Sequence, residues 1–335
     1  MSGEEQQLPV VLLYNVDSTW TAEDAADCLL HAERLANGLR DEGHPVEMAE
    51  VRTDIAGPLR GHDPREAVIF NWCEGIDGQP NAYDLVTRTL DDLGFVYTGS
   101  GAWALANTQN KALTKQWLEK HGISTPRGRV FTDTRDVSEW DIFPAIVKPV
   151  AEHCSYGITA DSVVDDVAGL KRQVEYELDR FGVGALVEEF VAGREINVSI
   201  WGNGAPYALP LYEIEFTDID DPRHRIVDFD AKWSLDSFMY RHTPSCCPAN
   251  LDEPTAERVR ATALTAYRVL QCRDYGRIDM RLRDGMPYVV DVNANCDITI
   301  DGGFAKTAKV AGYSYGAMGS QIVKWASHRM TIHQD

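Results

Sequence analysis

The sequence predicts a mixed α/β fold (α/β with α+β parts), and three observations indicate it. Over about the first hundred residues, short apolar runs of strand type alternate with amphipathic helical stretches, which is typical of a parallel sheet with helices on its faces. A shorter set of strands and one helix then predicts a second, smaller unit. Further on, strand-like runs are separated by tight turns such as GNG, which predicts antiparallel pairing.

The N-terminal elements follow in order. The apolar run PVVLLYNV is a strand, and Thr21 with Asp24 is a capping-box signal for a helix that should end at Gly43. HPVEMAEV and EAVIFNWCEG are the next strands, and NAYDLVTRTLDDLG is a helix. After the loop YTGSG, one helix is expected over residues 101–122, because Gly122 ends the periodic stretch.

In the remaining sequence, FPAIVKPV and ALVEEFV are strands on either side of a helix over residues 165–182. Residues 217–250 are polar and poorly periodic, and so long a segment is usually a lid, a binding loop or disordered. A helix over residues 251–272 leads into a hairpin turned at Asp284 and Gly285, and a last helix follows.

Composition excludes some functions. The 335 residues carry a formal charge of −20, from 52 acidic and 32 basic residues, whereas a protein that binds nucleic acid needs clustered Lys and Arg. No apolar stretch reaches the roughly 18 residues of a membrane span, and no leader-like run opens the sequence. We therefore expect a cytoplasmic protein without nucleic-acid or membrane partners.

The cysteines predict no disulfide framework. Seven Cys at irregular spacings, without a CxxC pair, suit reduced thiols better than disulfides or a zinc site. The adjacent Cys246 and Cys247 are interpreted as buried small hydrophobic residues.

Two carboxylates and a carboxamide near the last hairpin predict a metal site. Asp291 and Asn293 stand two apart in a strand, so they point to the same face, and the hairpin can bring Asp279 beside Asp291. Hard oxygen ligands of this kind suit Mg²⁺ that carries nucleotide phosphates. Alone, the pattern fits a solvated hairpin end equally well, because Asp and Asn are common near turns.

Two lysines and a loop favour the metal site. Lys148 ends an apolar strand before Pro149, and Lys111 lies on the helix after YTGSG. The loop EHCSYG offers backbone amides and Ser155 for covering phosphates. Each lysine alone is more often a surface charge, but together with a metal they form a clamp for a triphosphate.

Patterns of other enzyme classes are missing. The sequence has no GxxxxGK[ST], no GxGxxG after the first strand, no HRD or DFG set and no GxSxG. His153 and Cys154 are neighbours on a loop and rarely face each other as a catalytic pair, so a cysteine nucleophile is not expected.

Taken in order, these motifs resemble those of the ATP-grasp carboxylate–amine ligases, most closely the D-alanine–D-alanine ligase family. The similarity extends from about residue 66 to the C-terminus through YTGSG with NKALTKQWLEKHGISTP, FPAIVKP with CSYGI, ALVEEFVAGREINVSI, DFDAKW with CPANL, and GRIDMRL with VVDVNANCDIT. It implies an ATP-grasp fold with an N-terminal Rossmann-like parallel-sheet domain (residues 1–103), a central ATP-grasp subdomain (104–187) and a C-terminal ATP-grasp domain with the metal site (188–335).

The resemblance also implies residues that contact ATP. These are Lys111 and Lys148 on the phosphates, Lys232 of the mobile loop on the transferred phosphoryl group, Glu188 and Val191 on adenine, and Glu195 on the ribose.

For metal binding and catalysis, it implies that Asp279, Asp291 and Asn293 hold two Mg²⁺ ions, with Mn²⁺ as an alternative. Arg277 would face the acyl phosphate and the developing oxyanion, and Ser155 would lie in the loop over the phosphates. The family usually has Glu at position 291, and Asp is one methylene shorter.

The substrate end departs from the family. NCDIT places Asp297 where the family has a glycine whose amide helps to form the oxyanion hole, and Gly302 falls where a small residue contacts the acceptor carboxylate. YNVDSTWTAEDAA and NWCEGIDGQPN also lack the family's usual substrate motifs. A carboxylate near the acceptor would disfavour a second carboxylate and favour a cationic amine.

Three functions remain open from the sequence. The leading one is an ATP-dependent ligase that forms an amide (peptide) bond through an acyl phosphate, releasing ADP and phosphate, on an amino-acid substrate of specialised metabolism. The second is a D-alanine–D-alanine ligase of cell-wall synthesis, and the third an ATP-binding protein without ligase activity. A homodimer is expected from the resemblance.

Overall fold

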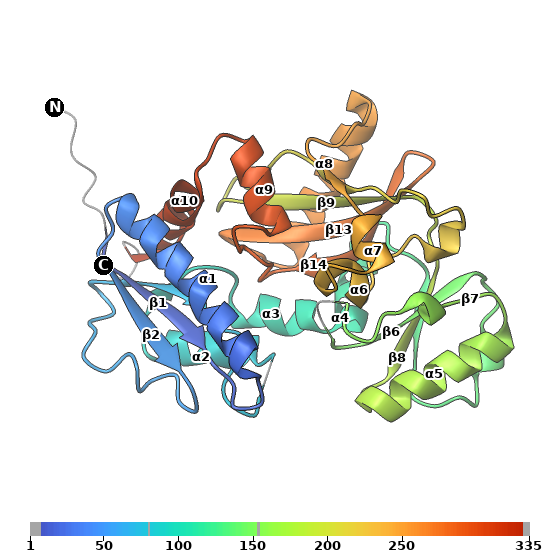
Figure 1. Ribbon diagram of the computed structural model, residues 1–335, viewed down its shortest axis with the longest axis horizontal. Helices are drawn as coiled ribbons and strands as arrows, with labels where there is room; N and C mark the ends of the chain where they lie inside the picture. Colours follow the sequence, from blue (N-terminus) through green and yellow to red (C-terminus); the bar gives the residue numbers. More distant parts are fainter. Residues whose placement is uncertain (1–7, 80, 153–154, 331–335) are drawn as a thin grey trace.

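The computed structural model describes residues 8–79, 81–152 and 155–330, and three sheets organise them. Figure 1 shows the N-terminal parallel sheet at one end of the molecule, the largest sheet in the middle and a small antiparallel sheet at the other end. The longer helices are α1 (Ala22–Asp41), α2 (Tyr83–Asp92), α3 (Ala102–Gln109), α4 (Lys111–Lys120), α5 (Val167–Phe181), α8 (Glu253–Val269), α9 (Gly303–Val310) and α10 (Tyr315–Ser327).

The N-terminal sheet is parallel, as predicted. Its order is β2-β1-β3-β4, with β1 (Val10–Asn15), β2 (Val46–Val51), β3 (Val68–Trp72) and β4 (Val96–Tyr97). Successive side chains of β1 point to opposite faces of the sheet. Val10 and Leu12 pack with α1 and α10, whereas Val11 and Leu13 pack with α2, so both faces are covered and the strand is apolar throughout.

Helix α1 begins and ends where the sequence predicts. The Thr21 side chain accepts from the Asp24 backbone N–H, and the Asp24 side chain accepts from the Thr21 backbone N–H, so the capping box is complete. Gly43, with φ of 90°, follows the helix end.

The single helix expected over residues 101–122 is wrong, because the structure has two helices. Asn110 has φ −101° and ψ 106°, outside the helical region, and its side chain accepts from the backbone N–H groups of Ala112 and Leu113. Asn is a strong N-cap because its side-chain oxygen replaces a missing helical acceptor. This cap starts α4 directly after α3 and places Lys111 at the first position of α4.

The small sheet forms the central unit. Its order is β5-β8-β6-β7, all antiparallel, with β5 (Gly128–Phe131), β6 (Ala145–Pro149), β7 (Val163–Val164) and β8 (Ala185–Glu189). Helix α5 packs its apolar side, including Leu170 and Val174, against Val147 and Val187 of this sheet.

The largest sheet is antiparallel and has the order β12-β11-β9-β13-β14, with β10 also pairing with β9. Its strands are β9 (Arg194–Trp201), β10 (Tyr207–Ala208), β11 (Tyr212–Ile214), β12 (Ser245–Cys246), β13 (Tyr275–Arg283) and β14 (Met286–Asn293). The hairpin between β13 and β14 is confirmed: Asp284 and Gly285 both have positive φ, as a two-residue type I′ turn requires.

The polar segment 217–250 carries short elements that its sequence does not reveal. They are a 3₁₀ turn (Pro222–His224), α6 (Phe229–Trp233), α7 (Phe238–Arg241) and strand β12. Helices this short are held by caps rather than by periodicity: Asp228 caps α6 and Ser237 caps α7. Cys246 and Cys247 are partly exposed, so their interpretation as buried residues is wrong.

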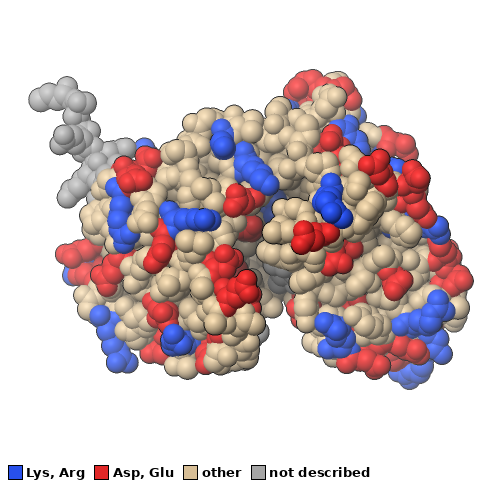
Figure 2. Space-filling view, in the orientation of Figure 1, with Lys and Arg blue, Asp and Glu red and all other residues tan. Residues whose placement is uncertain are grey.

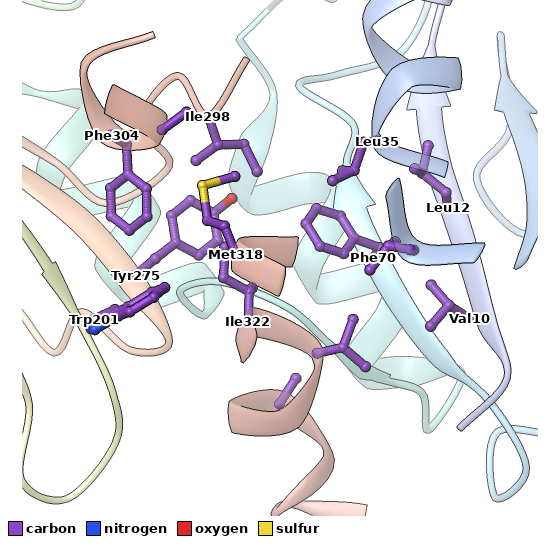
Figure 3. Packing of buried hydrophobic residues seen from close by; sticks show 14 of the residues in the cluster. Val10, Leu12, Leu35, Phe70, Trp201, Tyr275, Ile298, Phe304, Met318 and Ile322 are labelled. Atoms are coloured by element: carbon purple, nitrogen blue, oxygen red, sulfur yellow. The ribbon is translucent and has the colours of Figure 1, made fainter. Parts of the chain in front are cut away.

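Helix α10 packs on the N-terminal sheet and shares a hydrophobic core with it. Figure 3 shows Met318 and Ile322 between Phe70 of β3 and Tyr275 of β13. The helix crosses α1 closely, since a Cβ on Gly316 would lie 2.4 Å from the Gly38 carbonyl oxygen. The division of the sequence at residues 103 and 187 stays a prediction.

Candidate active site

A large cleft lies where the N-terminal part, the largest sheet and the small sheet meet, and all of the predicted site residues line it. Figure 2 shows the notch that opens between the N-terminal end of the molecule and the end with the small sheet. The predicted residues that the structure brings together there are Lys111, Lys148, Ser155, Glu188, Val191, Glu195, Lys232, Arg277, Asp279, Asp291 and Asn293. His153 and Cys154 of the same loop lie outside the described residues.

The three predicted metal ligands meet at the base of the last hairpin. Asp279 of β13 pairs directly with Asp291 of β14, and the Asn293 amide Nδ2 donates to Asp279 Oδ2 at 3.0 Å. The pairing register shifts directly after Asp279, and irregularities of this kind re-aim side chains beside functional sites.

Arg277 lies against this group. Its Nε and Nη2 donate to the two Asp279 carboxylate oxygens at 2.6 and 2.8 Å. Burial lowers the pKa of Arg277, but the Asp279 carboxylate outweighs it, so the net shift is upward and the guanidinium stays charged. The alternation of β13 brings Arg277, Asp279 and Arg281 to the cleft.

The donor set fits a divalent metal such as Mg²⁺. Two carboxylates and one carboxamide supply hard oxygens within one hairpin. The Asp279 carboxylate has about four acceptor sites, so the bidentate Arg277 contact leaves capacity for a cation. Within the described residues, no group of three or more His, Cys, Asp or Glu side chains is arranged to hold a metal ion.

Glu188, which lines the cleft, lies between two lysines. Its Oε1 is 2.7 Å from Lys115 Nζ and its Oε2 is 2.8 Å from Lys148 Nζ. All three side chains are buried. Burial raises the pKa of Glu188, but the ammonium groups of Lys148 and Lys115 outweigh this effect, so the net pKa is lowered and the carboxylate stays charged.

Sequence reasoning missed Lys115. The signal was present, because Lys115 follows Lys111 by four residues and so lies on the same helical face. The prediction also placed the Glu188 side chain near adenine, and that role stays a prediction; both of its oxygens contact lysines in this structure.

The other cations approach from separate elements. Lys111 Nζ, at the start of α4, donates to the Glu152 carbonyl oxygen, and Lys232 comes from α6 of the segment 217–250. Ser155 has φ of 61°, and its Oγ donates to the Val227 carbonyl oxygen at 2.7 Å. This bond joins the predicted phosphate loop to the segment that carries Lys232.

The predicted nucleotide hinge contains a further arginine. Arg281 Nε donates to the Val191 carbonyl oxygen at 3.1 Å, and Arg281 Nη1 donates to Glu195 Oε2 at 2.7 Å and to the Arg225 carbonyl oxygen at 3.0 Å. Arg281 therefore fixes the hinge, Glu195 and the segment 217–250 relative to one another.

The opposite end of the cleft is acidic. Its lining includes Glu23, Asp24, Asp27, Glu74, Asp297 and Asp301. Glu74 is exposed at the cleft wall; the protein atoms around its carboxylate displace water and raise its pKa, and the Asp297 carboxylate raises it further. Asp297 also fills the space beside Gly302, where a Cβ would lie 2.8 Å from Asp297 Oδ2.

Comparison with known proteins places this architecture in a family. Residues 117–324 match the family model described as the D-ala D-ala ligase C-terminus. The protein belongs to the D-alanine–D-alanine ligase family. Figure 1 shows that the matched region covers the small sheet, the largest sheet and most of α10.

Relatives of the family are similar over nearly the whole length. The D-alanine–D-alanine ligase of Desulforamulus reducens is 30% identical, with 87% of this chain and 89% of the relative covered. The y4sG protein of Sinorhizobium fredii is 28% identical, with 89% and 88% covered. The crystal structure of the Bacillus anthracis D-alanine–D-alanine ligase complexed with ATP has a TM-score of 0.75 at 22% identity, with 97% and 99% covered.

Family membership gives the fold and the class of reaction. The fold is ATP-grasp, with a parallel N-terminal sheet and antiparallel sheets beyond it. The protein is an ATP-dependent carboxylate–amine ligase of the ADP-forming, C–N bond-forming class. Among the described helices, none has the length and apolar composition needed to cross a membrane.

Proposed function

We propose that the protein activates a small carboxylic acid, an amino acid of specialised metabolism, and couples it to an amine. A carboxylate oxygen attacks the γ-phosphorus of ATP, which forms an acyl phosphate and releases ADP. The amine nitrogen then attacks the acyl carbon, loses a proton, and inorganic phosphate leaves with the C–O bonding pair. The observation that carries this proposal is the convergence of buried lysines, a carboxylate hairpin and Arg277 in one cleft.

The residues divide this work by position. Lys111 and Lys148 bind ATP phosphates, and Lys232 reaches the transferred group from the lid (residues 217–250). Positioning and charge neutralisation supply most of the catalysis in phosphoryl transfer. Arg277, kept charged by Asp279, stabilises negative charge that develops on the acyl oxygen. Ser155 holds the phosphate loop against the lid through Val227.

The nucleotide and metal assignments complete the site. Val191 and Glu188 belong to the adenine side of the cleft and Glu195 to the ribose side. Asp279, Asp291 and Asn293 would hold two Mg²⁺ ions, or Mn²⁺, which neutralise phosphate charge. The protein is proposed to work in the cytoplasm as a homodimer on small molecules, without nucleic-acid or membrane partners.

The acceptor is proposed to be an amine without a neighbouring carboxylate. Asp297 lies against Gly302 and accepts a hydrogen bond from the Thr299 backbone N–H at 2.8 Å, so its carboxylate is held in place. A second carboxylate there would meet like charge, whereas an ammonium or a neutral amine would not. This observation disfavours D-alanine as the acceptor and favours specialised metabolism over cell-wall synthesis.

The decisive experiment is nucleotide release with Mg²⁺, ATP, pooled D- and L-amino acids and a pool of simple amines, followed by mass analysis. Release of ADP that depends on a carboxylate, together with a coupled product, is expected. Release of AMP would contradict acyl-phosphate chemistry, and rapid formation of D-alanyl-D-alanine would establish the cell-wall reaction instead. Binding of ATP without turnover would leave an ATP-binding protein.

The acceptor assignment has its own test. Asp297→Asn keeps the shape and removes the charge, so the ratio of kcat/KM for an amino-acid acceptor to that for its decarboxylated amine should rise about tenfold. Competition assays with each acceptor pair measure this ratio. Asp161→Asn, at an exposed position outside the cleft, serves as the control. An unchanged ratio would show that Asp297 does not face the acceptor.

A further inference from the structure

Lys115 has a complete set of partners. Its Nζ is 2.7 Å from Glu188 Oε1, donates to Thr125 Oγ1 at 2.8 Å, and donates to the Pro126 carbonyl oxygen. An ammonium group has three N–H donors, so these three acceptors use all of them. Lys115 is therefore a fixed cation that has no donor left for a ligand.

Lys148 differs from Lys115 although it shares Glu188. In the part of the chain that the structure describes, Glu188 Oε2, at 2.8 Å, is the hydrogen-bond acceptor of Lys148 Nζ. Lys148 lies at the end of β6 and lines the large cleft, whereas Lys115 lies behind Glu188 on α4. Two N–H groups of Lys148 remain for a ligand in the cleft.

The net charge of Lys115, Glu188 and Lys148 determines how strongly Lys148 can attract an anion. One carboxylate between two ammonium groups leaves one net positive charge. Because Lys115 is saturated, it neutralises Glu188, and the charge that remains is that of Lys148 at the cleft. Without Lys115, Glu188 and Lys148 would form a neutral pair, and Lys148 would have to leave Glu188, its acceptor among the described residues, to bind an anion.

The strand beside the pair is also adapted to it. A Cβ on Gly128 of β5 would lie 2.8 Å from Lys115 Cε and 3.2 Å from Glu188 Cγ. Gly128 has no positive φ, so a glycine is needed here to avoid a steric clash and not for its backbone conformation. The neighbouring strand thus leaves room for Lys115 to reach Glu188.

We propose that Lys115 is a positioning residue for the nucleotide, which neutralises Glu188 and so leaves the Lys148 charge available to phosphate oxygens. This inference rests on the proposed assignment of Lys148 to ATP phosphates. It extends the ATP site by a residue that touches no ligand itself.

Calorimetric binding of ATP, ADP and adenosine, with Mg²⁺ present and no carboxylic acid or amine, tests the proposal. In Lys115→Met, the Kd of ATP and ADP should rise about tenfold to a hundredfold, the range of one charge-assisted contact, while the Kd of adenosine stays the same. Lys120→Met removes an equal charge from the exposed end of α4 and should change neither. An equal loss for adenosine would reduce Lys115 to a structural role and overturn the proposal.

A second variant separates charge from packing. Lys115→Arg keeps the positive charge beside Glu188, so ATP affinity should stay near the wild-type value. Lys115→Gln removes the charge but keeps an N–H donor, and it serves if Lys115→Met does not fold; it should weaken ATP and ADP binding and leave adenosine binding unchanged. Weak ATP binding by Lys115→Arg, or undiminished ATP binding by Lys115→Gln, overturns the proposal. Because no turnover is measured, the proposed ligation can fail while this inference holds.

Discussion

Lys148 can be removed without leaving an uncompensated charge, because Glu188 keeps Lys115 as its partner. Breaking a buried pair usually costs several kcal/mol through the charge left behind, and here that charge stays paired. We therefore expect Lys148→Ala to abolish ADP formation with little change in Tm. Coupled ADP assays and thermal unfolding measure both, with the exposed Lys171→Ala as the control. Retained ADP formation would remove Lys148 from the phosphate site.

The buried Glu177 on α5 should make the stability of the protein depend on pH. The side chain is fully buried, its Oε2 has no hydrogen-bond partner among the described residues, and burial raises its pKa to about 7 from the ordinary 4.5. Between these values the unfolded chain has released the proton that the folded protein retains, so stability is present below about pH 4.5 and is lost as the pH rises through 7.

Glu177→Gln should therefore raise the free energy of unfolding by about 1 to 3 kcal/mol at pH 8 and leave it nearly unchanged at pH 4. Urea unfolding at the two pH values measures this difference. A gain of equal size at both values would mean that packing, and not ionisation, explains the effect.

At the scale of elements, the crossing of α1 and α10 depends on two glycines. A Cβ on Gly316 would lie 2.4 Å from a backbone oxygen of Gly38, and backbone atoms cannot rotate away. Gly316→Ala should therefore lower stability by about 1 to 3 kcal/mol. Gly303→Ala is the matched helical control, since its Cβ would meet Tyr212 at an ordinary 3.9 Å. Equal stabilities in thermal unfolding would show that the crossing adjusts freely.

The helices and strands also differ in how well the sequence predicts them. Short apolar runs, the Thr21 capping box and the turn at Asp284 and Gly285 identified strands and helix ends, because each depends on neighbouring residues. The break at Asn110 escaped, since the helical periodicity continues through it and only the side-chain cap ends it. Helix α9 and the short lid helices lacked a periodic signal long enough to be recognised.

The hairpin carboxylates, Asn293, Lys111, Lys148 and Ser155 were predicted from residue types and order, and the other site residues from the family resemblance. The cleft contains every predicted residue. The contacts between these side chains could not be predicted from the sequence in the same way. That Glu188 would contact two lysines depends on how β6, β8 and α4 pack, and that Arg281 would join Val191, Glu195 and Arg225 depends on how the lid lies. Such contacts between distant segments leave no local pattern.

At the scale of the whole molecule, the proposed lid (residues 217–250) contacts both the loop that carries Ser155 and strand β13. Ser155 Oγ donates to the Val227 carbonyl oxygen and Arg281 Nη1 donates to the Arg225 carbonyl oxygen, while Trp233 and Leu235 are exposed. Few buried contacts make such a segment open readily. ATP with Mg²⁺ should slow tryptic cleavage at Lys232 and Arg241 about tenfold, because phosphates bring the lid into contact with both sides of the cleft.

Mass mapping of the fragments measures these rates, and cleavage at the exposed Arg135, outside the cleft, supplies the internal control. If the lid sites and Arg135 respond alike, the nucleotide stabilises the molecule in general and does not close the lid.

The place of α10 has a consequence for biosynthesis. The sheet of β1 to β4 is translated first, yet one of its faces is covered by a helix that ends at Ser327. At typical rates of synthesis, roughly ten to fifty seconds separate the two segments on the ribosome. During this interval Val10, Leu12 and Phe70 lack their final cover. The nascent protein thus passes through a stage in which this apolar face of the sheet is open to chaperones and to other chains.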